Sequence, residues 1–292
     1  MATQTVPGVF FSRSAESPPL PIVIDSPHSG FDYPPDFCPV APVAAVLTSC
    51  DRFVDELWGA APQYGATLVA ALFPRAYIDP NRSAADIDPE LLDETWPGTG
   101  QASDYTRRGM GLIRRYALPG IPLYERKLTV TEVQNRLSEY YIPYRKRIGT
   151  AIEEAFVQHG AVWHCNCHSM KPQGNAMNTD AGNSRPDFVL SDRLGKTCDG
   201  RFTDWLAGRF KRRGYSVKIN DPYQGGDLVA TFGRPALKRN SVQIEINRAL
   251  YLDGMTFQKS PGFDRLAADL SGVLRELGEF VRAHLASGSE ES

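Results

Sequence analysis

The chain lacks a long hydrophobic run, because no stretch approaches the ~18 consecutive apolar residues of a membrane-spanning helix. Residues 1–19 contain charges and prolines instead of the unbroken apolar segment of a secretion signal. These absences argue against a membrane or secreted protein and predict a cytoplasmic one.

An excess of charge of one sign is also missing. Lys and Arg number 32 against 34 Asp and Glu, so the net charge is −2. Without a basic field the chain is not expected to bind nucleic acid or an anionic membrane, and a small molecule is the expected partner. The 5 cysteines are an odd number without a disulfide-scaffold pattern, so reduced thiols are expected. Composition leaves the oligomeric state open.

Several familiar catalytic motifs are absent. The sequence has no G-x-S-x-G elbow, no glycine-rich phosphate loop with G-K-[ST], no G-x-G-x-x-G after the first strand and no H-E-x-x-H helix. Serine hydrolases, P-loop enzymes, classical dehydrogenases and helix-type zinc proteases are therefore disfavoured.

The chain does contain alternating strand and helix patterns, which are typical of an α/β sheet with helices on both faces. Residues 1–292 show no repeat or linker and are interpreted as a single catalytic domain. Residues 83–122 are expected to form a long loop or lid, and 1–19 and 287–292 to be flexible. Strands are predicted at 21–25, 66–73, 160–168, 187–190, 215–219 and 241–246. Helical spacing is present at 43–61, where Thr48 or Ser49 could cap a segment that begins near Asp51, and helices are predicted at 131–159 with an interruption near Pro143, 200–213 and 263–286.

One predicted strand carries both histidines and cysteines, in the order His164-Cys165-Asn166-Cys167-His168. Side chains of a strand alternate between its two faces, so the histidines and Asn166 share one face and the cysteines the other. This disfavours a structural zinc site that would use both residue types. His168 ends the strand and is the candidate ligand, whereas His164 lies deeper and is expected to be a hydrogen-bonded buried histidine.

Two further candidate ligands lie near the start of the chain. His28 follows a short buried strand, in a tight loop at its carboxyl end, where α/β folds bind ligands. Asp51 lies near a predicted helix start. Two histidines and one carboxylate, with water as the fourth ligand, make an open catalytic zinc site, so His28, Asp51 and His168 are candidate ligands. A structural histidine and a carboxylate favoured by the helix dipole are the alternatives.

A carboxylate beside such a metal can act as a general base. Zinc lowers the pKa of its water towards ~7, and the carboxylate can take the proton and pass it to a leaving amine. Glu245 is the candidate, because it shares one face of an alternating strand with Gln243. A strand with one face in solvent explains the same pattern.

Two arginines flank a polar block that includes Asp79 and Asn81. Guanidinium groups bind carboxylates and stabilise oxyanions, so Arg75 and Arg82 are candidates for contacting the substrate. An arginine and aspartate structural pair, with Asn81 as a turn residue, is the alternative. The loop Asn220–Gly226 is polar and suited to touching a substrate, but it is also an ordinary turn sequence.

Taken together and in order, these motifs resemble the N-formylglutamate amidohydrolase family over residues 20–255. More distantly they resemble zinc carboxypeptidases and aspartoacylases, which implies a phosphorylase/hydrolase-like fold with a mixed central sheet. The motifs are Pro27-His28-Ser29-Gly30, Asp51, Arg75 with Asp79-Pro80-Asn81-Arg82, His168-Ser169, Pro186-Asp187-Phe188, Asn220 with Gly225-Gly226, and Glu245.

The resemblance implies a divalent metal held by His28, Asp51 and His168, with zinc first and manganese or cobalt as alternatives. It implies Glu245 as general base and then acid, and Arg75 as the residue that polarises the scissile carbonyl. The expected substrate-binding residues are Asn81, Arg82, Asn220, Gly225 and Gly226. The implied reaction is hydrolysis of N-formyl-L-glutamate to L-glutamate and formate, as in histidine degradation.

Two departures from the pattern bear on the site and its substrate. The carboxypeptidase-type relatives have an acidic ligand three residues after the first histidine, where this chain has Phe31, so Asp51 must act from a separate segment, with Asp55 as its rival. Some family members carry Asp where this chain has Asn166, so an outer carboxylate is missing there. The alternatives are a hydrolase of another N-acyl amino acid or small peptide, and a noncatalytic binder of an acidic metabolite.

Overall fold

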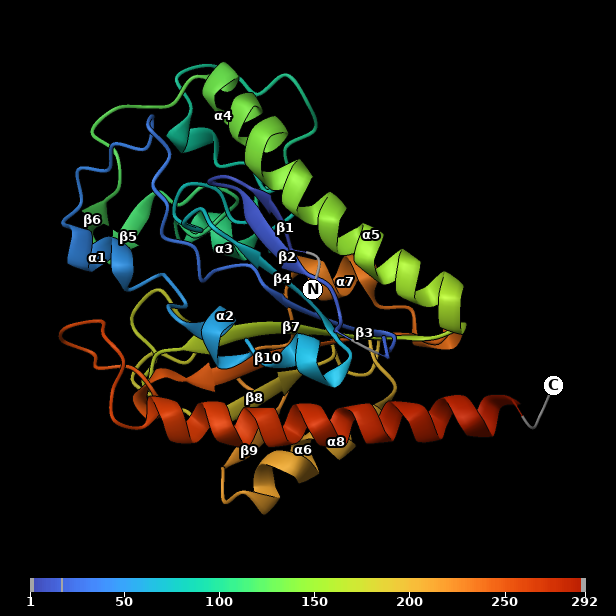
Figure 1. The fold of residues 1–292 in the computed structure, drawn as a ribbon. Helices are drawn as coiled ribbons and strands as arrows, with labels where there is room; N and C mark the ends of the chain where they lie inside the picture. Colours follow the sequence, from blue (N-terminus) through green and yellow to red (C-terminus); the bar gives the residue numbers. More distant parts are fainter. Residues whose placement is uncertain (1–2, 17, 290–292) are drawn as a thin grey trace.

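An eight-stranded mixed sheet forms the centre of the protein (Figure 1). The computed structural model describes residues 3–16 and 18–289. The strand order is β1-β2-β4-β3-β7-β10-β8-β9, and the four strands from β4 to β10 in this order run parallel. The strands are β1 (Thr3–Val6), β2 (Phe10–Arg13), β3 (Ile22–Ser26), β4 (Thr67–Ala71), β7 (Val162–Met170), β8 (Phe188–Ser191), β9 (Val217–Ile219) and β10 (Arg239–Asn247). The predicted α/β fold class with a mixed sheet is confirmed.

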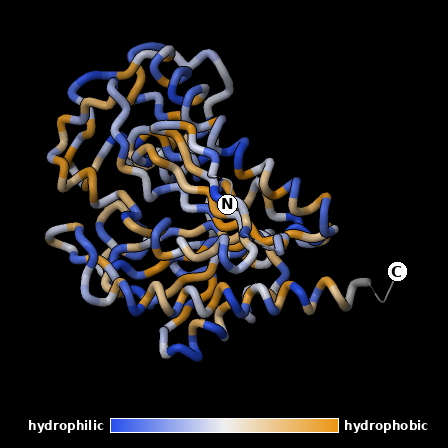
Figure 2. Tube along the Cα trace, in the orientation of Figure 1, coloured by the Kyte–Doolittle hydropathy of each residue, from blue (hydrophilic) through white to orange (hydrophobic). Residues whose placement is uncertain are grey.

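Helices cover both faces of this sheet, and each face has its own apolar core. Figure 1 shows α5 and α8 on opposite sides of the strands. Hydrophobic and hydrophilic stretches alternate along α8, as a helix with one buried face requires (Figure 2). One core includes α2 (Val54–Leu57), α6 (Gly200–Arg212) and α8 (Phe263–Ser289), and the other α4 (Val130–Arg136), α5 (Ile142–His159) and α7 (Asp227–Phe232).

The face assignment of β7 is confirmed. Cys165 and Cys167 are buried in the core beneath α6 and α8, and all cysteines of the chain are free. On the opposite face, His164 is held by Ser241 Oγ at 2.7 Å and by Asp25 Oδ1 at 2.7 Å. His164 is therefore the hydrogen-bonded buried histidine that the sequence predicts.

The predicted helix over residues 131–159 is interrupted as expected. A π-helical turn, Leu137–Tyr141, separates α4 from α5, and Pro143 is the second residue of α5. Proline has no N–H to donate to the preceding turn, and a wider turn accommodates that loss. The result is one long rod lying across the sheet (Figure 1).

The expectation that residues 1–19 are flexible is wrong for most of the segment. β1 and β2 pair antiparallel with each other, and β2 pairs with β4, because Val9 and Phe10 bury their side chains in the core. Residues 1, 2 and 17 lie outside the described residues. At the other end, α8 continues to Ser289, beyond the start of the tail expected at 287, and residues 290–292 lie outside the described part.

The helical region predicted at 43–61, with a segment beginning near Asp51, consists of two short helices, α1 (Val43–Leu47) and α2, separated by the non-helical segment that carries Asp51. Phe53 has a left-handed backbone, with φ of 63°, which no continuous helix allows. Residues 83–122 contain short elements: η2 (Pro89–Leu91), α3 (Asp104–Arg107), β5 (Tyr116–Leu118) and β6 (Ile121–Pro122). Among the described residues, no helix is long and apolar enough to cross a membrane.

Candidate metal centre

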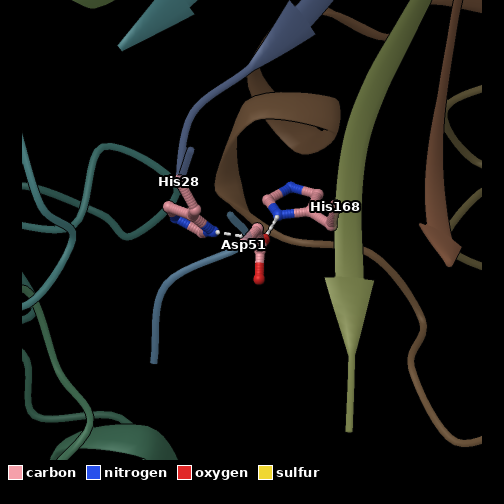
Figure 3. A group of neighbouring side chains, drawn as sticks. All are labelled: His28, Asp51 and His168. Carbon is pink, nitrogen blue, oxygen red and sulfur yellow. Dashed lines mark hydrogen bonds and ion pairs between the residues drawn. The ribbon is translucent and has the colours of Figure 1, made fainter. Parts of the chain in front are cut away.

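Side chains from three distant segments converge at the carboxyl ends of the parallel strands. His28 lies in the loop after β3, Asp51 between α1 and α2, and His168 on β7. Asp51 Oδ2 lies 3.4 Å from His28 Nδ1 and 3.2 Å from His168 Nδ1 (Figure 3). One ligand atom from each residue fits within a span of 4.8 Å, and all three side chains are buried. This is the donor set of two nitrogens and one oxygen that suits an open zinc site.

The second ring nitrogen of each histidine is held by an acceptor. His28 Nε2 lies 2.7 Å from Asp79 Oδ1, and His168 Nε2 lies 2.7 Å from Asn166 Oδ1. These contacts orient both rings so that the two Nδ1 atoms face Asp51. Ligating histidines in metalloproteins are oriented in this way. His28 Nδ1 is buried without a hydrogen-bond partner, so the residues fit a cation between them.

The Asp51 carboxylate is fixed from its other side. Its Oδ1 accepts hydrogen bonds from Ser169 Oγ at 3.1 Å and from Arg248 Nη2 at 2.8 Å, and its backbone N–H donates to His28 O at 2.9 Å. Burial raises the pKa of Asp51, but the two histidines and the Arg248 charge outweigh burial and hold it well below its usual range. Asp51 is therefore an ionised carboxylate held in one orientation between the two histidines. Its rival Asp55 lies outside the cluster.

Asp79 links Arg75 to the first histidine. It accepts two hydrogen bonds from Arg75, from Nε at 3.1 Å and from Nη2 at 2.5 Å, and a third from His28. Burial raises the pKa of Asp79, but Arg75, His28 and Arg82 together hold it well below the usual range. The arginine and aspartate pair left open as an alternative is therefore present, and through it Arg75 positions His28.

Glu245 lies on β10, directly opposite His168 in the pairing with β7. Both side chains line one pocket, together with His28, and we call this the central pocket. Gln243, two residues earlier on the same face, donates from Nε2 to Glu245 Oε1 at 2.9 Å. Burial raises the pKa of Glu245 to about 7, and the Asp51 charge acts in the same direction, against the opposing effects of His168 and Arg75. A carboxylate with a pKa near neutrality is suited to exchanging protons.

Four of the five expected substrate-binding residues also line the central pocket: Asn81, Arg82, Gly225 and Gly226. The amide of Asn81 is already engaged, because its Oδ1 accepts from Leu228 N at 2.9 Å and its Nδ2 lies 3.0 Å from His168 Nε2. Arg82 stacks on Tyr105, with its guanidinium carbon 3.9 Å from the ring centroid. Arg82 therefore presents a charge to the pocket, whereas Asn81 connects elements around it.

The structure does not bring Asn220 to the pocket. Its side chain accepts from Asp192 N at 3.1 Å and donates to Asp192 Oδ1 at 2.8 Å. Asn220 also has a left-handed backbone, with φ of 57°, a conformation that asparagine tolerates. It stabilises the loop after β9, as the ordinary-turn alternative predicts.

Asn166 connects His168 to a buried carboxylate, Asp25. Its Nδ2 donates to both oxygens of Asp25, at 2.9 and 3.1 Å, which turns its Oδ1 towards His168. Asp25 also accepts from Tyr144 Oη at 2.9 Å and contacts His164 Nε2 at 2.7 Å. A buried carboxylate therefore lies behind His168, and Asn166 connects the two.

We expect Asn166→Ala to weaken metal binding roughly 10- to 100-fold, the usual effect of losing a group that orients a ligand. The measurement is competition for the metal with a chelator of known affinity. Cys167→Ala is the matched control, because it alters the next residue of the same strand on the opposite face. Equal weakening in both variants would mean that Asn166 acts through strand packing only.

Sequence reasoning missed several residues that form this site. Gln243 was detectable, since strand alternation places it beside Glu245. Asp25 was detectable only in part, as a charge inside an apolar strand. Lys171 and Arg248 directly follow the carboxyl ends of β7 and β10, so the strand-end signal could have found them. Arg114 and Arg185 lie outside the named strands and helices and carry no such signal.

Comparison with known proteins agrees with this geometry. The family model described as N-formylglutamate amidohydrolase matches residues 20–252. A protein named N-formylglutamate deformylase from Pseudomonas aeruginosa is 26% identical over 274 residues, which cover 90% of this chain and 93% of that protein. The solved structure of an N-formylglutamate amidohydrolase from Ralstonia eutropha JMP134 is 42% identical with a TM-score of 0.89, and the match covers 95% of this chain and 99% of that one. A gene product from Agrobacterium tumefaciens, 17% identical with a TM-score of 0.67 over 95% of this chain and 96% of its own, shares the fold.

Proposed function

This chain belongs to the N-formylglutamate amidohydrolase family, and from this premise we propose that it hydrolyses the formyl amide of N-formyl-L-glutamate to L-glutamate and formate. The observation that carries the proposal is the cluster of His28, Asp51 and His168 beside Glu245 in the central pocket. The names of the relatives support the substrate. We further propose that the whole chain is one catalytic domain, because residues as far apart in the sequence as His28 and Glu245 line that pocket.

His28, Asp51 and His168 would hold a divalent cation, and two nitrogens with one carboxylate favour zinc. When bound, the cation would polarise the scissile carbonyl and lower the pKa of water. Asp79 and Asn166 keep the two imidazole rings oriented for this purpose.

Glu245 is proposed as the group that moves protons. As a carboxylate it would take a proton from the attacking water, and as a carboxylic acid it would return that proton to the leaving amine nitrogen. Its buried position and raised pKa support both roles, because neither protonation state is strongly disfavoured near pH 7. Gln243 orients it through the hydrogen bond to Oε1.

The substrate carboxylate next to the amide is proposed to bind Arg82, whose charge faces the central pocket from its stack on Tyr105. Gly225 and Gly226 have no side chain, which allows their backbone to lie close to Asn81 and to the substrate in the central pocket. A Cβ on Gly226 would lie 2.4 Å from the Asn81 amide. Arg75 lines the same pocket and is proposed to stabilise the developing oxyanion while Asp79 holds its Nε and Nη2 atoms.

A screen of N-acyl amino acids with the metal-supplemented protein tests this function by measuring the released amine. We expect N-formyl-L-glutamate to give the highest kcat/KM, ahead of N-acetyl-glutamate, N-acetyl-aspartate and small peptides. If another compound is turned over faster, that compound replaces N-formyl-L-glutamate as the proposed substrate. If the metal-loaded protein hydrolyses none of the compounds, the result indicates a binding protein. In the cell, we place the reaction in the cytoplasm, as a step of histidine degradation.

A further inference from the structure

A second pocket adjoins the central pocket and is strongly basic. We call it the basic pocket; among the described residues it has no carboxylate in its lining. It shares Arg75, Arg114 and Tyr223 with the central pocket, so these side chains lie at the boundary between the two pockets. The cationic side chains of the basic pocket are Arg75, Arg114, Lys171, Arg185 and Arg248.

Three of these cations already have partners. Arg75, Arg185 and Arg248 each contact an aspartate, at 2.5, 2.7 and 2.8 Å respectively. Arg114 and Lys171 form no ion pair with any carboxylate in residues 3–16 and 18–289. The basic pocket therefore carries positive charge that the described part of the protein does not neutralise.

Of the two unpaired cations, Arg114 is buried and Lys171 is partly buried. Arg114 is 8% exposed and its Nε has no hydrogen-bond partner. Burial and the neighbouring Arg75 lower the pKa of Arg114 to about 9, and burial and Arg248 lower the pKa of Lys171 to about 8. Buried charges without partners are costly and usually mark a place where a ligand supplies the opposite charge. An anion held between them would reverse both shifts.

We propose that the basic pocket binds the side-chain carboxylate of the substrate through Arg114 and Lys171, which restricts the enzyme to N-acylated dicarboxylic amino acids. This inference rests on the proposed function, since the reacting amide and the first carboxylate occupy the central pocket. Arg114 and Tyr223 line both pockets, so a short substrate side chain that extends from the central pocket past these residues would enter the basic pocket. A guanidinium and an ammonium together suit a carboxylate.

The kinetic test compares N-formyl-L-glutamate with N-formyl-L-glutamine, which has the same shape without the charge. We expect Lys171→Met to lower kcat/KM for the glutamate compound about 10- to 150-fold, the range for a hydrogen bond to a charged group, and to lower it much less for the glutamine compound. Arg114→Lys, which keeps the charge, should lose less than Arg114→Met. Lys211→Met, at an exposed position on α6, is the control for net charge and should change neither value.

Equal losses with both compounds, or no loss with either, would overturn the proposal. Circular-dichroism melting identifies a variant that has lost its fold. If Arg114→Met does not fold, Lys171→Met still tests the proposal, because Lys171 is less buried than Arg114. The conclusion then rests on the ratio of the two kcat/KM values, which a general loss of active protein leaves unchanged.

A binding measurement separates this proposal from the proposed function. By calorimetry on the metal-loaded protein, glutarate should bind at least about 10-fold more tightly than butyrate, and Lys171→Met should remove the difference. If no formyl compound is hydrolysed but this difference is present, the function fails and the anion subsite stands. If hydrolysis occurs but glutarate and butyrate bind alike, the subsite fails and the function stands. Inorganic phosphate binding without a preference for glutarate would likewise overturn a carboxylate subsite.

Discussion

Replacing Glu245 by glutamine is expected to lower kcat about 10²- to 10⁴-fold, the range of general acid–base catalysis, while the protein keeps its full complement of metal. Glutamine has nearly the same size and still offers an oxygen to Gln243 Nε2, so the pocket should keep its shape. It has no carboxylate to accept the proton of water. Metal content by elemental analysis and kcat by amine release are the two measurements.

The pH profile should locate the same group. Only the ionised carboxylate can act as the base, so kcat/KM of the wild type should fall as the pH drops through the pKa of Glu245. That pKa is raised to about 7 by burial in the chain alone, and a bound cation would lower it. Glu245→Gln should lose this acidic limb.

Glu279→Gln, at an exposed position of α8, is the matched control and should keep both rate and profile. A metal-replete Glu245→Gln protein working at the full rate would eliminate the proposed mechanism. A variant that has lost its metal as well would instead show that Glu245 helps to build the metal centre.

His168→Ala is expected to lose both the metal and the activity. In the proposed metal centre His168 would supply one nitrogen ligand, and it contacts Asp51 at 3.2 Å, so its loss should weaken metal binding by more than the roughly 10- to 100-fold effect of an outer group. A ligand that binds only the folded protein stabilises it, by about 4 kcal/mol at a thousand times its Kd. Added zinc should therefore raise the Tm of the wild type and leave that of His168→Ala nearly unchanged.

His159→Ala is the control for this substitution, because His159 is the last residue of α5 and lies outside the cluster. It should keep about one metal per chain and full activity. A His168→Ala protein that binds zinc and hydrolyses substrate like the wild type would mean that the metal lies elsewhere or that none is used.

Much of the fold follows from local patterns. The strands at the opening, at His164 to His168 and around Glu245 are short apolar or alternating runs, and strand geometry alone places the cysteines of β7 away from the histidines. Within residues 43–61 a segment was predicted to begin near Asp51, and α2 begins at Val54, after the left-handed Phe53 that ends any helical run from α1. Helical spacing carries no information about such a break.

The site was predicted less completely than the fold. Strand ends supplied His28, His168 and Glu245, since side chains at the carboxyl ends of parallel strands must lie near one edge of the sheet. Asp51 was chosen for its place near a helix start. It lies in the non-helical segment before α2, and its own backbone N–H donates to His28 O. Asn220 was grouped with the glycines that follow it, and its side chain instead contacts Asp192.

The sequence by itself determined which side chains each strand presents on each face and at its carboxyl end, because strand alternation is a property of neighbouring residues. Only the tertiary structure decided which of these ends meet, and which residues from outside the strands join them. The placement of Asp25 behind Asn166, of Asp79 behind His28 and of Arg114 beside Lys171 depends on strand order and on the packing of residues 83–122. Those arrangements result from many contacts between residues far apart in the chain, and no local pattern encodes such contacts.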